Sequence, residues 1–184
     1  MRLFAALPPP DRTLRTLAEW RDGWRDPAWP VRWVRPASLH VTLRFFGEVP
    51  EAMAPALGRM LDDAGKDTGL LVLEPTAVRS FPGGARARVV WLELWPEPAL
   101  ELLAHRVEQG STALGLAPAR EPFRPHVTLG RVERTARLPR EAAARVAGAP
   151  LPAPFSVGEL HLMESHLGSG PPRYAVRHVS ALAA

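Results

Sequence analysis

Alternating apolar and polar residues mark two long segments of the chain as strands. These segments cover 38–49 (SLHVTLRFFGEV) and 123–132 (FRPHVTLGRV), and both contain the four residues His-Val-Thr-Leu. A period of two is typical of a strand that buries one face. Shorter apolar runs bounded by proline or glycine predict further strands at 2–7, 70–81, 87–94, 153–165 and 173–182.

Apolar residues spaced three and four apart predict helices between these strands. Asp11 is placed to cap a first helix, and Pro50 begins a second. A third helix is predicted over 98–114, with Leu102 among its inward-facing candidates. A short alanine-rich helix follows at 139–148 and ends in glycine.

The order of the predicted elements repeats. Each half of the chain reads strand, helix, HVTL strand, helix and strand, a degenerate repeat of about 85–90 residues that suits a lobe better than a solenoid unit. Neighbouring strands joined by turns favour antiparallel pairing. We therefore predict an α+β fold in a single bilobal domain over 1–184. Its two pseudo-two-fold-related lobes of mostly antiparallel sheet should have outer helices and a central cleft.

The repeated HVTL motif places a histidine and a threonine on the same side of each strand. Because side chains alternate between faces, His40 shares a face with Thr42, and His126 shares a face with Thr128. The apolar residues between them should face the core. One HVTL is ordinary in a half-exposed strand, but two copies at corresponding points of a repeat favour a shared site with one pair from each lobe.

Two facing histidines are suited to cleaving a phosphoester without a metal. A neutral imidazole can take the proton of the attacking water or hydroxyl, and a protonated one can give a proton to the departing oxygen. An ordinary pKa of about 6.5 makes both forms available around neutral pH. The threonine hydroxyls can donate hydrogen bonds to nonbridging phosphate oxygens, and an arginine would neutralise the phosphate.

The amino-acid composition excludes some classes of catalytic and metal-binding chemistry. The chain has no cysteine, which excludes disulfides, thiolate catalysis and cysteine-bound zinc. Its net charge is +4, and Lys66 is the only lysine among 23 basic residues. Arginines suit an anionic partner, although a GC-rich genome would produce the same bias. No apolar run approaches the roughly 20 residues of a membrane helix, so we expect a soluble, cytoplasmic protein.

Histidines near the end of the chain raise the alternative of a metal site. His161, Glu164, His166 and His178 lie close together in sequence. His161 and His166 are separated by an odd number of positions, so one strand cannot present both on one face. We therefore predict structural roles for these side chains and no metal.

The motifs and their flanks together resemble a known family. The chain is similar to the two-histidine phosphoesterase superfamily, in its branch of RNA 2′,3′-cyclic phosphodiesterases or 2′,5′ RNA ligases, through the segments RLFAAL, HVTLRFFGEV, FPGGARARVVWLEL, FRPHVTLGR and RYAVRHVSAL. The resemblance covers essentially the whole chain. It implies a bilobal α+β fold, no metal or other cofactor, and hydrolysis of an RNA-terminal 2′,3′-cyclic phosphate to a 2′-phosphate.

The resemblance also implies roles for individual residues. His40 would be the proton donor to the leaving O3′, and His126 would be the proton acceptor that activates water. Thr42 and Thr128 would hold phosphate oxygens. The family's phosphate-contacting arginine falls on Arg131.

Arg131 and two further residues are candidates for binding the substrate. Strict alternation would place Arg131 on the core face, so its role requires a bulge in the strand near Gly130. Arg44 lies on the His40 face by parity and is a second candidate for contacting phosphate. Phe46 shares that face and is a candidate platform for stacking a terminal base.

Two alternatives to the hydrolase remain. Some members of the family reversibly join tRNA halves, which makes the first alternative an ATP-independent 2′,5′ RNA ligase. The second is a non-catalytic module that binds RNA ends with a steep dependence on salt. In each case we expect a monomer whose partners are RNA ends.

Overall fold

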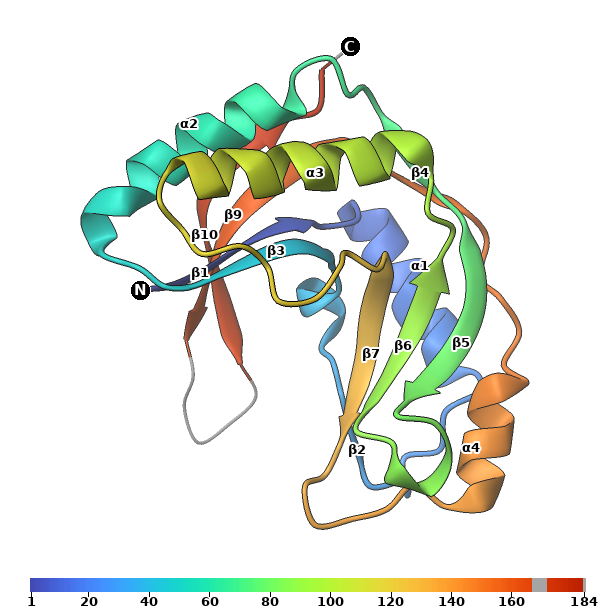
Figure 1. The fold of residues 1–184 in the computed structure, drawn as a ribbon. Helices are drawn as coiled ribbons and strands as arrows, with labels where there is room; N and C mark the ends of the chain where they lie inside the picture. Colours follow the sequence, from blue (N-terminus) through green and yellow to red (C-terminus); the bar gives the residue numbers. More distant parts are fainter. Residues whose placement is uncertain (167–171, 184) are drawn as a thin grey trace.

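The computed structural model describes residues 1–166 and 172–183. Its long sheet has eight strands in the order β10-β9-β1-β3-β7-β6-β5, with β2 beside β7, and β4 and β8 form a separate pair (Figure 1). The strands are β1 (Arg2–Leu7), β2 (Val31–Trp33), β3 (Val41–Glu48), β4 (Leu71–Leu73), β5 (Pro75–Phe81), β6 (Val89–Leu94), β7 (His126–Val132), β8 (Phe155–Val157), β9 (Glu159–His166) and β10 (Arg173–Ala181). The helices are α1 (Asp11–Asp22), α2 (Ala54–Gly65), α3 (Pro98–Ala113) and α4 (Arg140–Ala147), with short 3-10 turns at η1 (Pro36–Ser38), η2 (Glu51–Met53) and η3 (Gly84–Arg86).

The sheet divides into two lobes at the junction between β3 and β7. The first lobe contains β10, β9, β1 and β3, and α2 and α3 lie together over one of its faces (Figure 1). The second lobe contains β7, β6, β5 and β2, with α1 and α4 on its outer side (Figure 1). The strand pairings of the described residues are antiparallel. The predicted α+β class, antiparallel sheet and outer helices are therefore confirmed.

The lobes are interleaved along the chain, although the predicted repeat is sequential. Strands β9 and β10 come from the end of the chain and pair onto β1, the first strand. Helix α3 follows β6 of the second lobe but packs against α2 and β3 of the first. The two lobes are thus tied to each other by the chain path as well as by the sheet. None of the helices in the described ranges is long and apolar enough to cross a bilayer.

Helix α3 shows where the predicted core needs correction. Its buried stripe contains Leu100, Leu103, Ala104 and Val107, whereas Leu102 is 49% exposed. Residues three, four and seven positions apart lie on one side of a helix, and Leu102 falls outside that set. The prediction that Leu102 faces inward is therefore wrong.

Both HVTL strands contain a bulge at the leucine of the motif. On β3, Thr42 pairs with Ala6 and Arg44 with Ala5, so Leu43 has no partner of its own on β1. A bulge inserts one extra residue and reverses the inward and outward parity of the residues that follow it. On β3 this holds up to a second register shift at Phe46, which lies between the pairs of Phe45 with Phe4 and Gly47 with Leu3.

The second motif repeats this irregularity. On β7, Thr128 pairs with Trp91 and Gly130 with Val90, which leaves Leu129 as the extra residue. Starting at the valine of the motif, successive residues of both strands follow the same burial pattern: buried, half-buried, buried, buried, exposed and buried. The bulge near Gly130 that Arg131 requires is therefore present.

Gly130 lies tightly against the side chains of β2, the strand that pairs with β7 at this point. A Cβ atom added there would come within 2.5 Å of Val31 Cγ1 and 3.0 Å of Trp33 Cε3. We predict that Gly130→Ala lowers the free energy of unfolding by about 1–3 kcal/mol, the usual cost of overpacking. Chemical denaturation of the variant and the wild type measures this difference.

The matched control is Gly83→Ala. A Cβ at Gly83 would meet nothing within 4 Å, and the backbone there has φ −63°, which alanine adopts without strain. This variant should unfold at the same denaturant concentration as the wild type. If Gly130→Ala is equally stable, the close packing of β2 on β7 is contradicted.

Candidate active site

Two histidines and two threonines meet on one face of the sheet. Strands β3 and β7 share a single residue pair, Val41 with Val127. Because the two strands are antiparallel, this pair places His40 opposite Thr128 and His126 opposite Thr42. These four side chains are half-buried, whereas the valine and leucine of each motif are buried in the core, so the four lie on the opposite face of the strands, which we call the open face.

The register also sets the separation of the two histidines. His40 and His126 are diagonal neighbours across the β3–β7 junction. In a regular antiparallel ladder, residues in such diagonal positions are about 7–8 Å apart. They are close enough for the charge of one to disfavour protonation of the other. The two imidazoles therefore lie within electrostatic reach of each other across the junction of the lobes.

Each imidazole is held by the backbone two residues before it. Nδ1 of His40 lies 2.8 Å from the carbonyl oxygen of Ser38, and Nδ1 of His126 lies 2.7 Å from that of Arg124. A carbonyl oxygen only accepts hydrogen bonds, so Nδ1 carries the proton in both rings. This leaves Nε2 of both histidines as the atom that exchanges protons with a substrate.

Aromatic rings from the neighbouring strands pack against both histidines. Phe4 of β1 lies 5.2 Å from His40, and Trp91 of β6 lies 4.6 Å from His126, measured between ring centroids. Tyr174 of β10 meets His40 edge-on at 5.4 Å, with an interplanar angle of 89°. The aromatic rings remove water from the imidazoles.

This environment makes both histidines harder to protonate. Burial lowers the pKa of His40, the hydrogen bond to Ser38 opposes that effect, and the charges of His126 and Arg131 lower the pKa further. Burial likewise lowers the pKa of His126, the bond to Arg124 opposes it, and Arg131 adds to the lowering. Both groups should therefore be neutral at physiological pH in the unliganded protein.

Arg131 lies on the open face because of the bulge at Leu129. It is exposed, whereas Gly130 and Val132 on either side are buried. Its charge acts on both histidines and also on the hydroxyl of Tyr174, whose pKa is raised by burial and lowered in part by Arg131. A single cation is thus within electrostatic reach of groups from both lobes.

The structure does not bring Arg44 to the site. Its side chain is buried on the core side of β3, where it forms an ion pair with Glu108 of α3 and donates a hydrogen bond to the carbonyl oxygen of Ala117. The prediction from parity was wrong because the bulge at Leu43 turns Arg44 inward. Arg44 instead ties β3 to α3 and to the segment that leads into β7.

Phe46 is likewise not at the site. It is buried in the core with 9% of its surface exposed. The same bulge places Phe45 on the open face, and 61% of Phe45 is exposed. The prediction that Phe46 is available to stack a base is therefore wrong, and the exposed aromatic ring at this point of β3 is Phe45.

Sequence reasoning missed the aromatic neighbours of the histidines. Phe4 and Trp91 lie in apolar runs that indicated only buried strands. Tyr174 is the only tyrosine of the chain, and nothing in its flanking sequence ties it to His40. Its proximity follows from the pairing of β10, β9 and β1.

The late histidines do not form one cluster. Each contacts a carboxylate of its own: His161 with Glu159 at 2.8 Å, His166 with Glu164 at 3.3 Å, and His178 with Asp62 at 2.8 Å. Within residues 1–166 and 172–183, no three His, Asp or Glu side chains are grouped to hold a metal ion.

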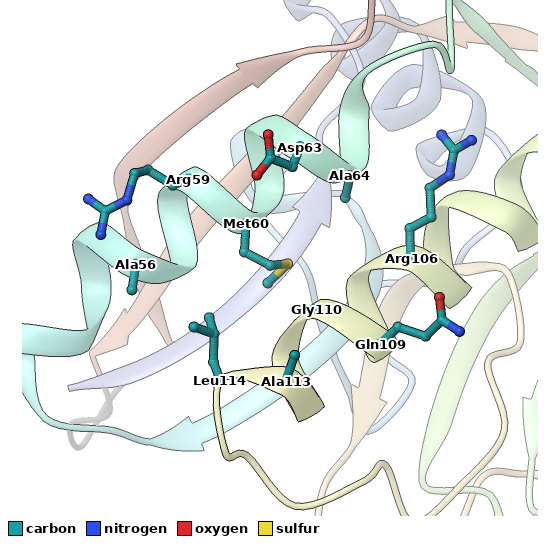
Figure 2. Close-up of a pocket in the computed structure, with 10 residues that line it drawn as sticks. All are labelled: Ala56, Arg59, Met60, Asp63, Ala64, Arg106, Gln109, Gly110, Ala113 and Leu114. Atoms are coloured by element: carbon teal, nitrogen blue, oxygen red, sulfur yellow. The ribbon is translucent and has the colours of Figure 1, made fainter.

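Two hollows mark the surface near these elements. One, of about 500 Å³, lies between α2 and α3 and contains the side chains of Met60, Arg59 and Arg106 but neither motif histidine (Figure 2). The other, of about 310 Å³, adjoins the site, since His126 and Trp91 are among its lining residues. Only the second hollow is continuous with the residues described above.

Replacing Arg131 tests the electrostatics of the site. We predict that Arg131→Ala raises the pKa of both His40 and His126, because a charge that disfavours their protonated forms is removed. NMR titration of the imidazole ring protons measures both values. Arg145→Ala, on the outer helix α4, is the control and should change neither. Unchanged titrations in Arg131→Ala would contradict the position assigned to this side chain.

Known proteins share both the sequence and the fold. A family model described as the 2′-5′ RNA ligase superfamily matches residues 9–169. A relative from Aeropyrum pernix named RNA 2′,3′-cyclic phosphodiesterase is 33% identical over 67% of this chain and 69% of its own length. A relative of the same name from Archaeoglobus fulgidus is 34% identical over 56% of this chain and 57% of its own.

Solved structures extend the likeness to the whole fold. A protein from Thermus thermophilus superposes with a TM-score of 0.81 at 27% identity, over 99% of this chain and 98% of its own. LigT of E. coli in complex with 3′-AMP superposes with a TM-score of 0.77 at 27% identity, over 98% and 97%. With the paired motifs in place on this fold, the chain belongs to the 2′-5′ RNA ligase superfamily.

Proposed function

We propose that this protein hydrolyses RNA-terminal 2′,3′-cyclic phosphates to 2′-phosphates by metal-independent acid–base catalysis. The observation that carries the proposal is the pair of imidazoles on adjacent strands, each with Nδ1 held by a backbone carbonyl and Nε2 left to act. The relatives named RNA 2′,3′-cyclic phosphodiesterase support the choice of substrate.

Each lobe supplies one of the two histidines that transfer protons in the proposed reaction. Nε2 of His126 takes a proton from water, whose oxygen attacks the phosphorus. The bond from phosphorus to O3′ breaks as Nε2–H of His40 gives a proton to that oxygen. The products are a 2′-phosphate and a free 3′-hydroxyl, and the two histidines have exchanged protonation states.

The remaining residues act on the charge of the phosphate. The hydroxyls of Thr42 and Thr128 donate hydrogen bonds to nonbridging oxygens, and Arg131 supplies the positive charge. Because Arg131 lies on the second lobe, the nonbridging oxygens should lie nearer to that lobe. These donors stabilise charge that increases as the water attacks.

Replacing either histidine should abolish activity without unfolding the protein. We predict that His40→Ala and His126→Ala each lower kcat for adenosine 2′,3′-cyclic phosphate by a factor of about 10²–10⁴, the usual contribution of a general acid or base. Circular dichroism monitors the fold. His105→Ala, on α3, is the control and should keep wild-type activity.

Two results would contradict this mechanism. One is a His126→Ala variant that retains full activity. The other is a wild-type protein that loses its activity in EDTA, which would indicate a metal. Analysis of the products tests the alternative reaction, since 2′,5′-joined RNA in place of a free 2′-phosphate would identify a ligase.

The lowered pKa values predict a particular dependence on pH. His40 must be protonated to act as an acid, so kcat/KM should decrease as pH rises through its lowered pKa in the free protein. The negative charge of a bound phosphate favours the imidazolium. The alkaline limb of kcat should therefore lie at higher pH than that of kcat/KM, as measured by steady-state kinetics from pH 4 to about 9. Coincident limbs would contradict His40 as the acid.

A further inference from the structure

Strand β2 places a second arginine directly beside Arg131. In the antiparallel pairing of β2 with β7, Arg32 lies opposite Arg131, one position away from the pair of Val31 with Val132. Residues directly opposite one another point to the same face of a sheet. The two valines are buried in the core and both arginines are exposed, so Arg32 shares the open face with Arg131.

The two arginines are close together and carry the same charge. Opposite residues in an antiparallel pair have Cβ atoms about 4.5–5.5 Å apart, and like charges in these positions are destabilising. Glu133 is the carboxylate next to this pair along the register, since its backbone nitrogen donates to the carbonyl oxygen of Pro30. Within the described part of the chain, none of the ion pairs includes Arg32, Arg131 or Glu133. The arginine pair therefore presents a concentration of positive charge that an anion would relieve.

The two arginines lie at different distances from the reacting groups. Strand β2 pairs with residues 130–132 of β7, which follow His126 and Thr128 along that strand. The charge of Arg131 lowers the pKa of both motif histidines, and Arg32 is not among the charges that do so. Arg32 is thus adjacent to the arginine that neutralises the reacting phosphate in the proposed mechanism, but it lies farther from the reacting phosphorus.

An RNA end supplies a second anion close to the first. The ribose that carries a terminal 2′,3′-cyclic phosphate also carries, on O5′, the phosphodiester that joins it to the rest of the chain. One ribose therefore separates two negative charges. A nucleoside 2′,3′-cyclic phosphate has only the first of them. Two adjacent arginines, of which one is assigned to the reacting phosphate, match the charges of an RNA end better than those of a free cyclic nucleotide.

We propose that Arg32 binds the phosphodiester on the 5′ side of the terminal nucleotide while Arg131 binds the reacting phosphate. This inference rests on the proposed function and makes the end of an RNA chain the preferred substrate over a free cyclic nucleotide. A guanidinium suits this role because its planar fork donates two parallel hydrogen bonds to a phosphate. A phosphodiester carries no information about the base. Arg32 therefore selects for chain ends and not for their sequence.

Two cyclic phosphates that differ by one phosphate group test this role. Arg32→Ala should raise KM for adenosine 5′-phosphate 2′,3′-cyclic phosphate, in which the 5′-phosphate stands in for the phosphodiester, with kcat unchanged. The expected increase is about 5- to 50-fold, as for the loss of one charge-assisted contact. KM for adenosine 2′,3′-cyclic phosphate should be the same in the variant and the wild type. Arg32→Lys, which keeps the charge, should show a smaller increase. Arg15→Ala, at an exposed position of the outer helix α1, is the matched control and should change neither KM.

Other outcomes overturn the inference in distinguishable ways. An unchanged KM of Arg32→Ala for the 5′-phosphorylated substrate would exclude Arg32 from binding that phosphate. An equal increase for both substrates would show that Arg32 acts on the reacting phosphate or on the packing of β2. Chemical denaturation separates these two cases. Removing one of two like charges should leave the free energy of unfolding unchanged or raise it, so a less stable variant would indicate a structural role.

A binding measurement keeps the test independent of turnover. Calorimetry with adenosine 2′,5′-bisphosphate and adenosine 2′-monophosphate should show that Arg32→Ala binds only the bisphosphate more weakly. The slope of log Kd against log salt concentration for the bisphosphate should fall by about 0.7–1, because one phosphate contact is lost. If the wild type hydrolyses neither cyclic phosphate, the proposed function fails while calorimetry still decides whether Arg32 binds the second phosphate. Equal affinity of the variant and the wild type for the bisphosphate would overturn the inference.

Discussion

The structure depends on the single backbone pair, Val41 with Val127, through which β3 and β7 join two lobes into one sheet. This pair sets the level of each histidine against the threonine of the other motif. A slip of one residue would turn one set of side chains into the core. A slip of two would shift the histidines by about 7 Å along the strands, either to directly opposite positions or further apart, and would remove their diagonal placement. The paired chemistry therefore requires this register.

The same kind of bulge has different consequences on the two motif strands. On each strand the bulge sends the residue after the motif inward and the following one outward. On β3 the inward residue is Arg44, which anchors α3 and the segment before β7. On β7 it is Gly130, against which the side chains of Val31 and Trp33 pack without room for a Cβ atom. The outward residues, Phe45 and Arg131, give the two sides of the site different chemistry.

The packing around the histidines determines their protonation. Aromatic rings from β1, β6 and β10 bury the imidazoles, and burial is the main reason that their pKa values are lowered. The carbonyl bonds select the same tautomer in both rings. A general base benefits directly from being neutral, whereas a general acid needs the charge of the bound substrate to become protonated. In the proposed mechanism, protonation of the acid and binding of the phosphate are therefore coupled.

The sequence by itself determined most of the elements, the α+β class and the pairing of His40, Thr42, His126 and Thr128, because alternation and a repeated motif are local signals. The strands predicted at 70–81 and 153–165 are each divided in two, because β4 and β8 pair with each other outside the long sheet. The bulge before Arg131 was also anticipated, because strict alternation would bury the arginine that the family resemblance assigns to the phosphate, and Gly130 is a residue at which a strand can bulge. Only the tertiary structure decided that Arg44 is buried and that Phe45, not Phe46, is exposed. No glycine marks the bulge at Leu43; it shows only in the pairing of β3 with β1. The placement of Tyr174 beside His40 likewise depends on strands from opposite ends of the chain, and periodicity within one strand carries no information about which distant strand lies next to it.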